Sequence, residues 1–173
     1  RVSTMKSPAI SQISNSNITS RAKYALRTAI VLAVAFLVTF GLYLYLLQSI
    51  KGWQVYVLAS VTAFVTLLNI LAIRYSLQKR IEVAAFLMIS GIILLFPIST
   101  AFLSGVGLVL GIGGLIGIYV VATLTLIQPH LTRAIVTGIV LGVVTILIDA
   151  FSPYVRLEIR LMTAFIPIVV IIG

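Results

Sequence analysis

The sequence contains no cysteine, a single histidine and only three acidic residues. The absence of cysteine excludes disulfides, thiolate metal sites and a cysteine nucleophile. The three carboxylates, Glu82, Asp149 and Glu158, lie near the ends of apolar segments or in a loop rather than at mid-segment. Ion-coupled pumps and proton relays usually carry an ionisable residue inside the membrane, so this distribution argues against an ion-coupled mechanism.

Charged residues of both signs make up 9% of the chain, against about 25% in a soluble domain, and 61% of the residues are hydrophobic. This composition identifies an integral membrane protein whose principal partner is the lipid bilayer. A net charge of +9 would suggest nucleic acid in a soluble protein. Here the basic residues flank apolar segments, so they are interpreted as topology signals and no nucleic-acid partner is expected.

Apolar segments account for most of the chain after a Ser- and Asn-rich stretch, residues 1–20, for which we predict a flexible cytoplasmic tail. Five segments approach the roughly 20 residues that a helix needs to cross the bilayer. A sixth is still apolar where the chain stops and is too short to span. The predicted fold is therefore all-α, a polytopic transmembrane helical bundle with five complete helices and a truncated sixth. The predicted spans cover residues 25–50, 53–73, 82–102, 105–127 and 131–151, with the incomplete one at 161–173.

Basic residues are distributed unequally between the two sides that these spans define. Nine fall on the side of the N-terminus and three on the other, which predicts a cytoplasmic N-terminus and a multi-pass protein of the plasma (inner) membrane. The nine are Arg1, Lys6, Arg21, Lys23, Arg27, Arg74, Lys79, Arg80 and Arg133; the three are Lys51, Arg156 and Arg160.

Glycine is concentrated in the fourth span, where residues 105–117 hold half of the twelve glycines. At 100° per residue, five of them fall within an arc of about 160°. Small residues allow helix backbones in lipid to approach closely, so we predict a packing face and expect this helix to be the one against which the others pack. The five are Gly107, Gly111, Gly113, Gly114 and Gly117.

A second face of small residues, Ala134, Gly138 and Gly142, occurs in the fifth span. Only a brief turn separates the fourth and fifth spans, which favours a tightly packed antiparallel hairpin. The same faces could instead support a homodimer, and the pattern does not separate the two arrangements.

Polar residues within the second span, Thr62, Thr66 and Asn69, recur at i, i+4 and i+7 and therefore share one face. An amide facing lipid would be costly, so this stripe should point into the bundle. Hydrogen bonding between helices is the simpler interpretation, and a ligand pocket is the alternative. For Asp149, an interfacial ion pair with Arg156 is favoured over a binding role.

The sequence does not bring potential catalytic groups within reach of one another. Ser104 and His130 flank the fourth span and are separated by 26 residues, or about 39 Å along a helix, too far for a nucleophile and its base. No catalytic, cofactor or metal site is predicted, and this part of the protein is not expected to be an enzyme.

The layout of spans one to six, with minimal loops and an even number of crossings, resembles the multi-pass N-terminal membrane regions of bacterial signalling proteins such as sensor histidine kinases and nucleotide cyclases. The resemblance implies a membrane-sensing or anchoring function, with a cytoplasmic output domain beyond Gly173. A transporter or permease component for a neutral or apolar solute is the alternative.

Overall fold

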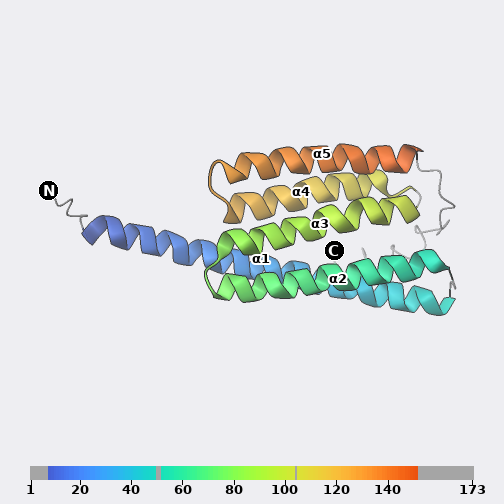
Figure 1. Cartoon of the computed structure of the whole chain (residues 1–173), viewed down its shortest axis with the longest axis horizontal. Helices are drawn as coiled ribbons and strands as arrows, with labels where there is room; N and C mark the ends of the chain where they lie inside the picture. The colour runs from blue at the N-terminus through green and yellow to red at the C-terminus, as the bar shows by residue number, and fades with distance from the viewer. Residues whose placement is uncertain (1–7, 50–51, 104, 152–173) are drawn as a thin grey trace, which may run out of the picture.

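The computed structural model describes residues 8–49, 52–103 and 105–151, and these fold into five α-helices that run back and forth in one bundle (Figure 1). Each helix contains a stretch long and apolar enough to cross a membrane. The truncated sixth helix predicted at 161–173 lies outside the described residues. The helices are α1 (Pro8–Ser49), α2 (Trp53–Leu77), α3 (Ile81–Phe102), α4 (Gly107–Thr125) and α5 (His130–Phe151).

Helix α1 begins at Pro8, so residues 8–20, expected to form a flexible tail, are helical. Its apolar part runs from Thr19 to Gln48, and the preceding turns project beyond the bundle (Figure 1). Adding residues to an existing helix costs far less than nucleating a new one. The apolar span can therefore continue into the polar residues 8–20 as one helix, although the composition of these residues alone does not predict a helix.

Helix α3 is the centre of the bundle, because among the described helices it alone contacts all four others. Helix α4, expected from its glycines to be the central helix, contacts α1, α3 and α5. The expectation was wrong for a physical reason: glycines permit a close approach to one neighbour, whereas centrality depends on how all five helices are arranged. Helix α3 lies between the α1–α2 pair and the α4–α5 pair (Figure 1).

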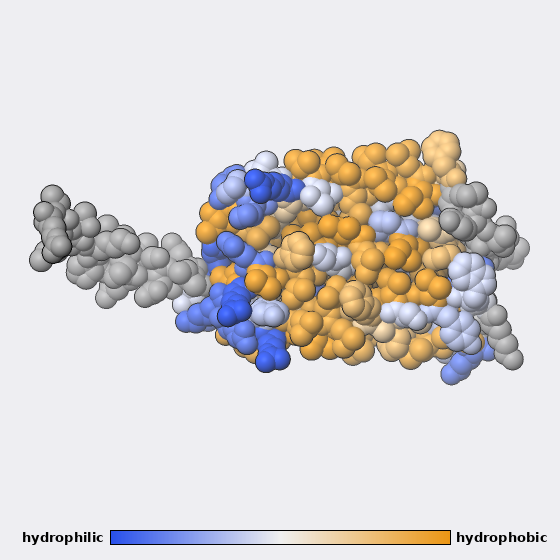
Figure 2. All heavy atoms as spheres, in the orientation of Figure 1, coloured by the Kyte–Doolittle hydropathy of each residue, from blue (hydrophilic) through white to orange (hydrophobic). Residues whose placement is uncertain are grey.

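The main core lies where these two pairs meet α3. Met88 and Ile92 of α3 are buried with Val65 of α2 and with Ile118 and Val121 of α4. Toward the end of the bundle where α2 begins, Trp53 packs edge-on against Phe102 of α3, with ring centroids 5.4 Å apart. The outward-facing side chains are also apolar, and they form a broad belt between two more polar ends (Figure 2).

One end of the bundle, here called the basic end, contains the turn between α2 and α3 and the turn between α4 and α5. Hydrophilic residues gather there in Figure 2. All seven Lys and Arg side chains that the structure describes belong to this end, and none within the described ranges belongs to the opposite end. They are Arg21, Lys23, Arg27, Arg74, Lys79, Arg80 and Arg133.

Candidate functional site

Helices α4 and α5 pack closely against each other and form the antiparallel hairpin expected from their short connection. A Cβ added to Gly111 would lie 2.9 Å from the carbonyl oxygen of Gly142, and one added to Gly142 would lie 3.1 Å from that of Gly111. Further along the hairpin, the Cα of Gly138 faces Ile118 and Leu115. Ala134 is buried in the next turn. The two small-residue faces thus meet within one chain at Gly111 and Gly142.

Three other glycines of α4 face α3 and differ in how closely they approach it. A Cβ on Gly114 would lie 2.8 Å from the Phe96 ring, and one on Gly117 would lie 3.2 Å from Ile92. Gly113 is exposed, and its nearest neighbour would be Phe96 at 3.7 Å, an ordinary van der Waals distance. The glycine arc therefore serves two neighbours, α5 through Gly111 and α3 through Gly114.

Asp149 of α5 caps the start of α4. Its Oδ1 accepts a hydrogen bond from the backbone N–H of Gly105, and its Oδ2 accepts one from that of Gly107, both at 3.1 Å. The N-cap residue Val106 supplies no side-chain bond, so the carboxylate from the neighbouring helix satisfies these amides and complements the helix dipole. Arg156, the expected ion-pair partner, lies outside the described residues.

Glycine is needed at both positions that donate to Asp149. Gly105 has φ +77°, a left-handed conformation that L side chains rarely adopt. A Cβ on Gly107 would lie 2.2 Å from the Cβ of Asp149. The first two glycines of the segment therefore make room for a carboxylate, a role that the spacing of small residues does not reveal.

The polar stripe on α2 points into the bundle, since Thr62, Thr66 and Asn69 are all buried. Its hydrogen bonds, however, remain within α2: the hydroxyls donate to Leu58 and Thr62 carbonyls, and Asn69 Nδ2 donates to the Val65 carbonyl at 2.9 Å. The expectation of hydrogen bonds between helices is thus not met by these side chains. A hydroxyl in a helix can bond the carbonyl four residues earlier, which needs no partner helix.

Asn69 is the one member of the stripe with an unsatisfied atom. Its Oδ1 is buried without a hydrogen-bond partner, and its Nδ2 lies beside Gly91 of α3. Because Nδ2 already donates to a carbonyl, the amide cannot be reversed to pair Oδ1 there. The stripe therefore has a single unpaired polar atom, Asn69 Oδ1, which does not form a polar pocket by itself.

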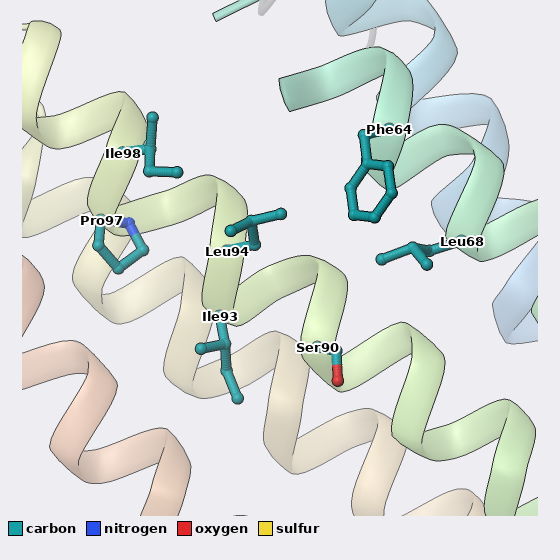
Figure 3. A pocket seen from close by; sticks show the side chains of 7 residues that line it. All are labelled: Phe64, Leu68, Ser90, Ile93, Leu94, Pro97 and Ile98. Atoms are coloured by element: carbon teal, nitrogen blue, oxygen red, sulfur yellow. The ribbon is translucent and has the colours of Figure 1, made fainter. Parts of the chain in front are cut away.

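The structure shows a groove of about 400 Å³ between α2 and α3. Phe64 and Leu68 of α2 point across it toward Leu94 and Ile98 of α3 (Figure 3). Ser90 is its one polar lining side chain. Pro97, inside α3, has no N–H, so the carbonyl four residues earlier lacks its usual donor. The groove is apolar and has a small polar edge.

No Asp, Glu, Lys, Arg or His side chain is buried in the described part of the bundle; the buried polar residues there are Thr, Ser and Asn, and Tyr43 is a buried phenol. His130 is exposed at the first residue of α5, and Ser104 lies outside the described residues. Among the side chains that the structure places, no three His, Cys, Asp or Glu residues could hold a metal ion. This arrangement can hold helices together, and the groove between α2 and α3 is lined almost entirely by apolar side chains.

Comparisons with protein-family models, with curated proteins and with solved structures found no match to this chain.

Proposed function

We propose that this chain is the membrane-sensing or anchoring N-terminal part of a bacterial signalling protein whose output domain follows Gly173. The observation that carries the proposal is the chemistry of the interior. All five buried threonines that the structure describes donate to a carbonyl of their own helix, and no Asp, Glu, Lys, Arg or His side chain that the structure describes is buried with them. Such an interior is suited to holding helices in register, and its described part lacks the charged residues that usually mark a pathway for ions.

The close glycine contacts support the same proposal, because a contact between backbones leaves little tolerance for displacement. A change at the bilayer that shifts α5 relative to α4 would be transmitted along both helices rather than absorbed by flexible side chains. In a signalling protein, the helix that enters the output domain would carry this displacement out of the membrane.

Reading the coding sequence beyond Gly173 is the first test. A connecting helix followed by a soluble domain is the expected result. Four or more further spans with no soluble domain would overturn the proposal and favour a transporter.

A functional test uses the full-length protein and two matched substitutions in α4. Gly111→Ala places a methyl group against the α5 backbone, whereas Gly113→Ala does not. If the α4–α5 contact transmits a signal, the first variant changes the basal activity of the output domain and the second leaves it unchanged. Equal activity of both variants and the wild type would argue against transmission through this contact.

A transporter or permease component for a neutral or apolar solute is the second candidate, and the groove between α2 and α3 favours it. Such a solute needs no ionisable residue on its path. Replacing Leu94 with Trp would fill the groove, so uptake of the solute would fall if the groove lies on that path and would stay unchanged if it does not.

A further inference from the structure

The turn between α2 and α3 has a lysine at a position where helices usually end with glycine. The backbone N–H of Lys79 donates to the Ser76 carbonyl at 3.0 Å, and that of Arg80 donates to the Tyr75 carbonyl at 2.9 Å. These two bonds form the Schellman motif, whose residue after the C-cap adopts a left-handed conformation and is usually glycine. Lys79 occupies that position with φ 60°.

The same fold uses glycine at its other described position of this kind, Gly105. A lysine at such a position is less stable than glycine, because its Cβ approaches the following carbonyl oxygen. The side chain of Lys79 is exposed, and its charge complements the C-terminal end of the α2 dipole, as those of Arg74 and Arg80 also do. A residue that is unfavourable for local structure therefore points to a role for its ammonium group outside the fold.

Four further cations belong to the same half of the basic end as Lys79, the half formed by α1, α2 and the start of α3. Arg74 belongs to the last turn of α2 and Arg80 to the turn itself. Lys23 and Arg27 belong to α1 and lie at a similar level, because their neighbours Ala22 and Ala25 pack with Ile81 at the start of α3. All five cations are exposed, and Glu82 is the one acidic residue that the structure places near them.

The other half of the basic end is much less charged. Among its described residues it carries Arg133 and His130. Arg21 adds its charge to this other half, because its guanidinium donates to the Thr125 carbonyl at the end of α4. The positive charge is therefore concentrated at one side of the bundle rather than spread evenly around it.

We propose that these five cations, here called the cationic rim (Lys23, Arg27, Arg74, Lys79 and Arg80), bind the phosphate headgroups of anionic phospholipids. The rim borders the apolar belt, which places it at headgroup depth once the belt is immersed (Figure 2). Arg27 and Arg74 are each about one to two helical turns deeper than Lys23 and Arg80, so the cations can contact both the phosphate and the outer part of a headgroup. Each Lys or Arg near an anionic surface strengthens binding about fivefold, so losing three should weaken it about a hundredfold.

The test places the whole chain in nanodiscs of phosphatidylcholine, or of phosphatidylcholine and phosphatidylglycerol in equal amounts, and compares the Tm in each. Phosphatidylglycerol should raise the Tm of the wild type, and less so at high salt. The triple variant Arg74→Gln, Lys79→Gln, Arg80→Gln should lose this increment, whereas Arg133→Gln should keep it. An increment that survives in the triple variant, or is lost equally in Arg133→Gln, overturns the proposal.

Substitutions of Lys79 alone keep the test decisive if the triple variant fails to fold. Lys79→Gly relieves the left-handed conformation, so its Tm in phosphatidylcholine should rise by about 2–4 °C while its phosphatidylglycerol increment shrinks. Lys79→Gln should lose part of the phosphatidylglycerol increment, and its Tm in phosphatidylcholine should not rise. An unchanged increment in both variants refutes a headgroup contact by Lys79. Inorganic phosphate added to the phosphatidylcholine nanodiscs should have no effect, and a Tm rise equal to that of the lipid would assign the rim to a soluble anion instead.

Discussion

The contact between Gly111 and Gly142 allows a quantitative test of how α4 and α5 are held together. In Gly111→Ala, the new methyl group would lie 2.9 Å from the Gly142 carbonyl oxygen and 3.0 Å from Ile146 Cγ1. The carbonyl is backbone and cannot rotate away, so the helices must separate. Overpacking of this kind costs about 1–3 kcal/mol.

The substitution also removes a glycine from a helix, which by itself stabilises by about 0.5–1 kcal/mol. Gly113→Ala is the matched control, because it makes the same change two residues away, where the nearest atom would be Phe96 Cε2 at 3.7 Å. The helix-propensity gain is common to both variants and cancels in their difference. We therefore expect Gly111→Ala to be less stable than Gly113→Ala by about 1–3 kcal/mol, or about 2–12 °C in Tm for a protein of this size.

Thermal unfolding in one detergent, followed by circular dichroism, measures this difference directly. Gly113→Ala should unfold at or above the wild-type Tm, and Gly111→Ala below it. Gly142→Ala should resemble Gly111→Ala, because its methyl group would meet the Gly111 carbonyl oxygen at 3.1 Å. If Gly111→Ala proved as stable as Gly113→Ala, the close backbone contact would not hold the hairpin together.

Three further predictions concern the cap, the α3 contact and the orientation. Asp149→Ala should lower the free energy of unfolding by about 0.5–2 kcal/mol, since two amides at the start of α4 lose their acceptor; the exposed Thr137→Ala is the control in the same unfolding assay. Gly114→Leu should lower the Tm more than Ile112→Leu, because Phe96 occupies the space beside Gly114 whereas Ile112 is exposed; equal Tm values would contradict this. In intact cells, an impermeant thiol reagent should label Gly52→Cys and spare Gln78→Cys, and the reverse pattern would invert the proposed orientation.

The number and positions of the spans could be predicted from the sequence because the bilayer imposes a length and excludes charge. Their ends were less predictable. The second span was expected to end near residue 73, yet α2 continues past Arg74 to Leu77 and ends at the Schellman turn. A long basic side chain can leave the apolar layer while its backbone stays helical, so charge marks the interface rather than the end of a helix.

The centre of the bundle could not be predicted in the same way. In a soluble helix the apolar face identifies the side that packs inward, but here the lipid-facing and inward-facing sides are both apolar. Helix α3 carries Phe86 and Ile93 toward the outside and Met88 and Ile92 toward the core, and residue type does not distinguish the two sets. Glycine is informative only where two backbones touch, so it indicated the α4–α5 contact and not the central position of α3.

The Asp149 cap was missed although the sequence held a usable signal for it. In an antiparallel hairpin, residues equally distant from the turn lie side by side. Gly107 lies 21 residues before Gln128 and Asp149 lies 21 residues after it, and the structure joins them by a hydrogen bond. Hairpin register therefore assigns a carboxylate to the amides at the start of α4, where a helix attracts negative charge. The expected partner of Asp149 was an arginine close to it in sequence. The short turn between α4 and α5 instead places the backbone N–H of Gly107 beside its carboxylate.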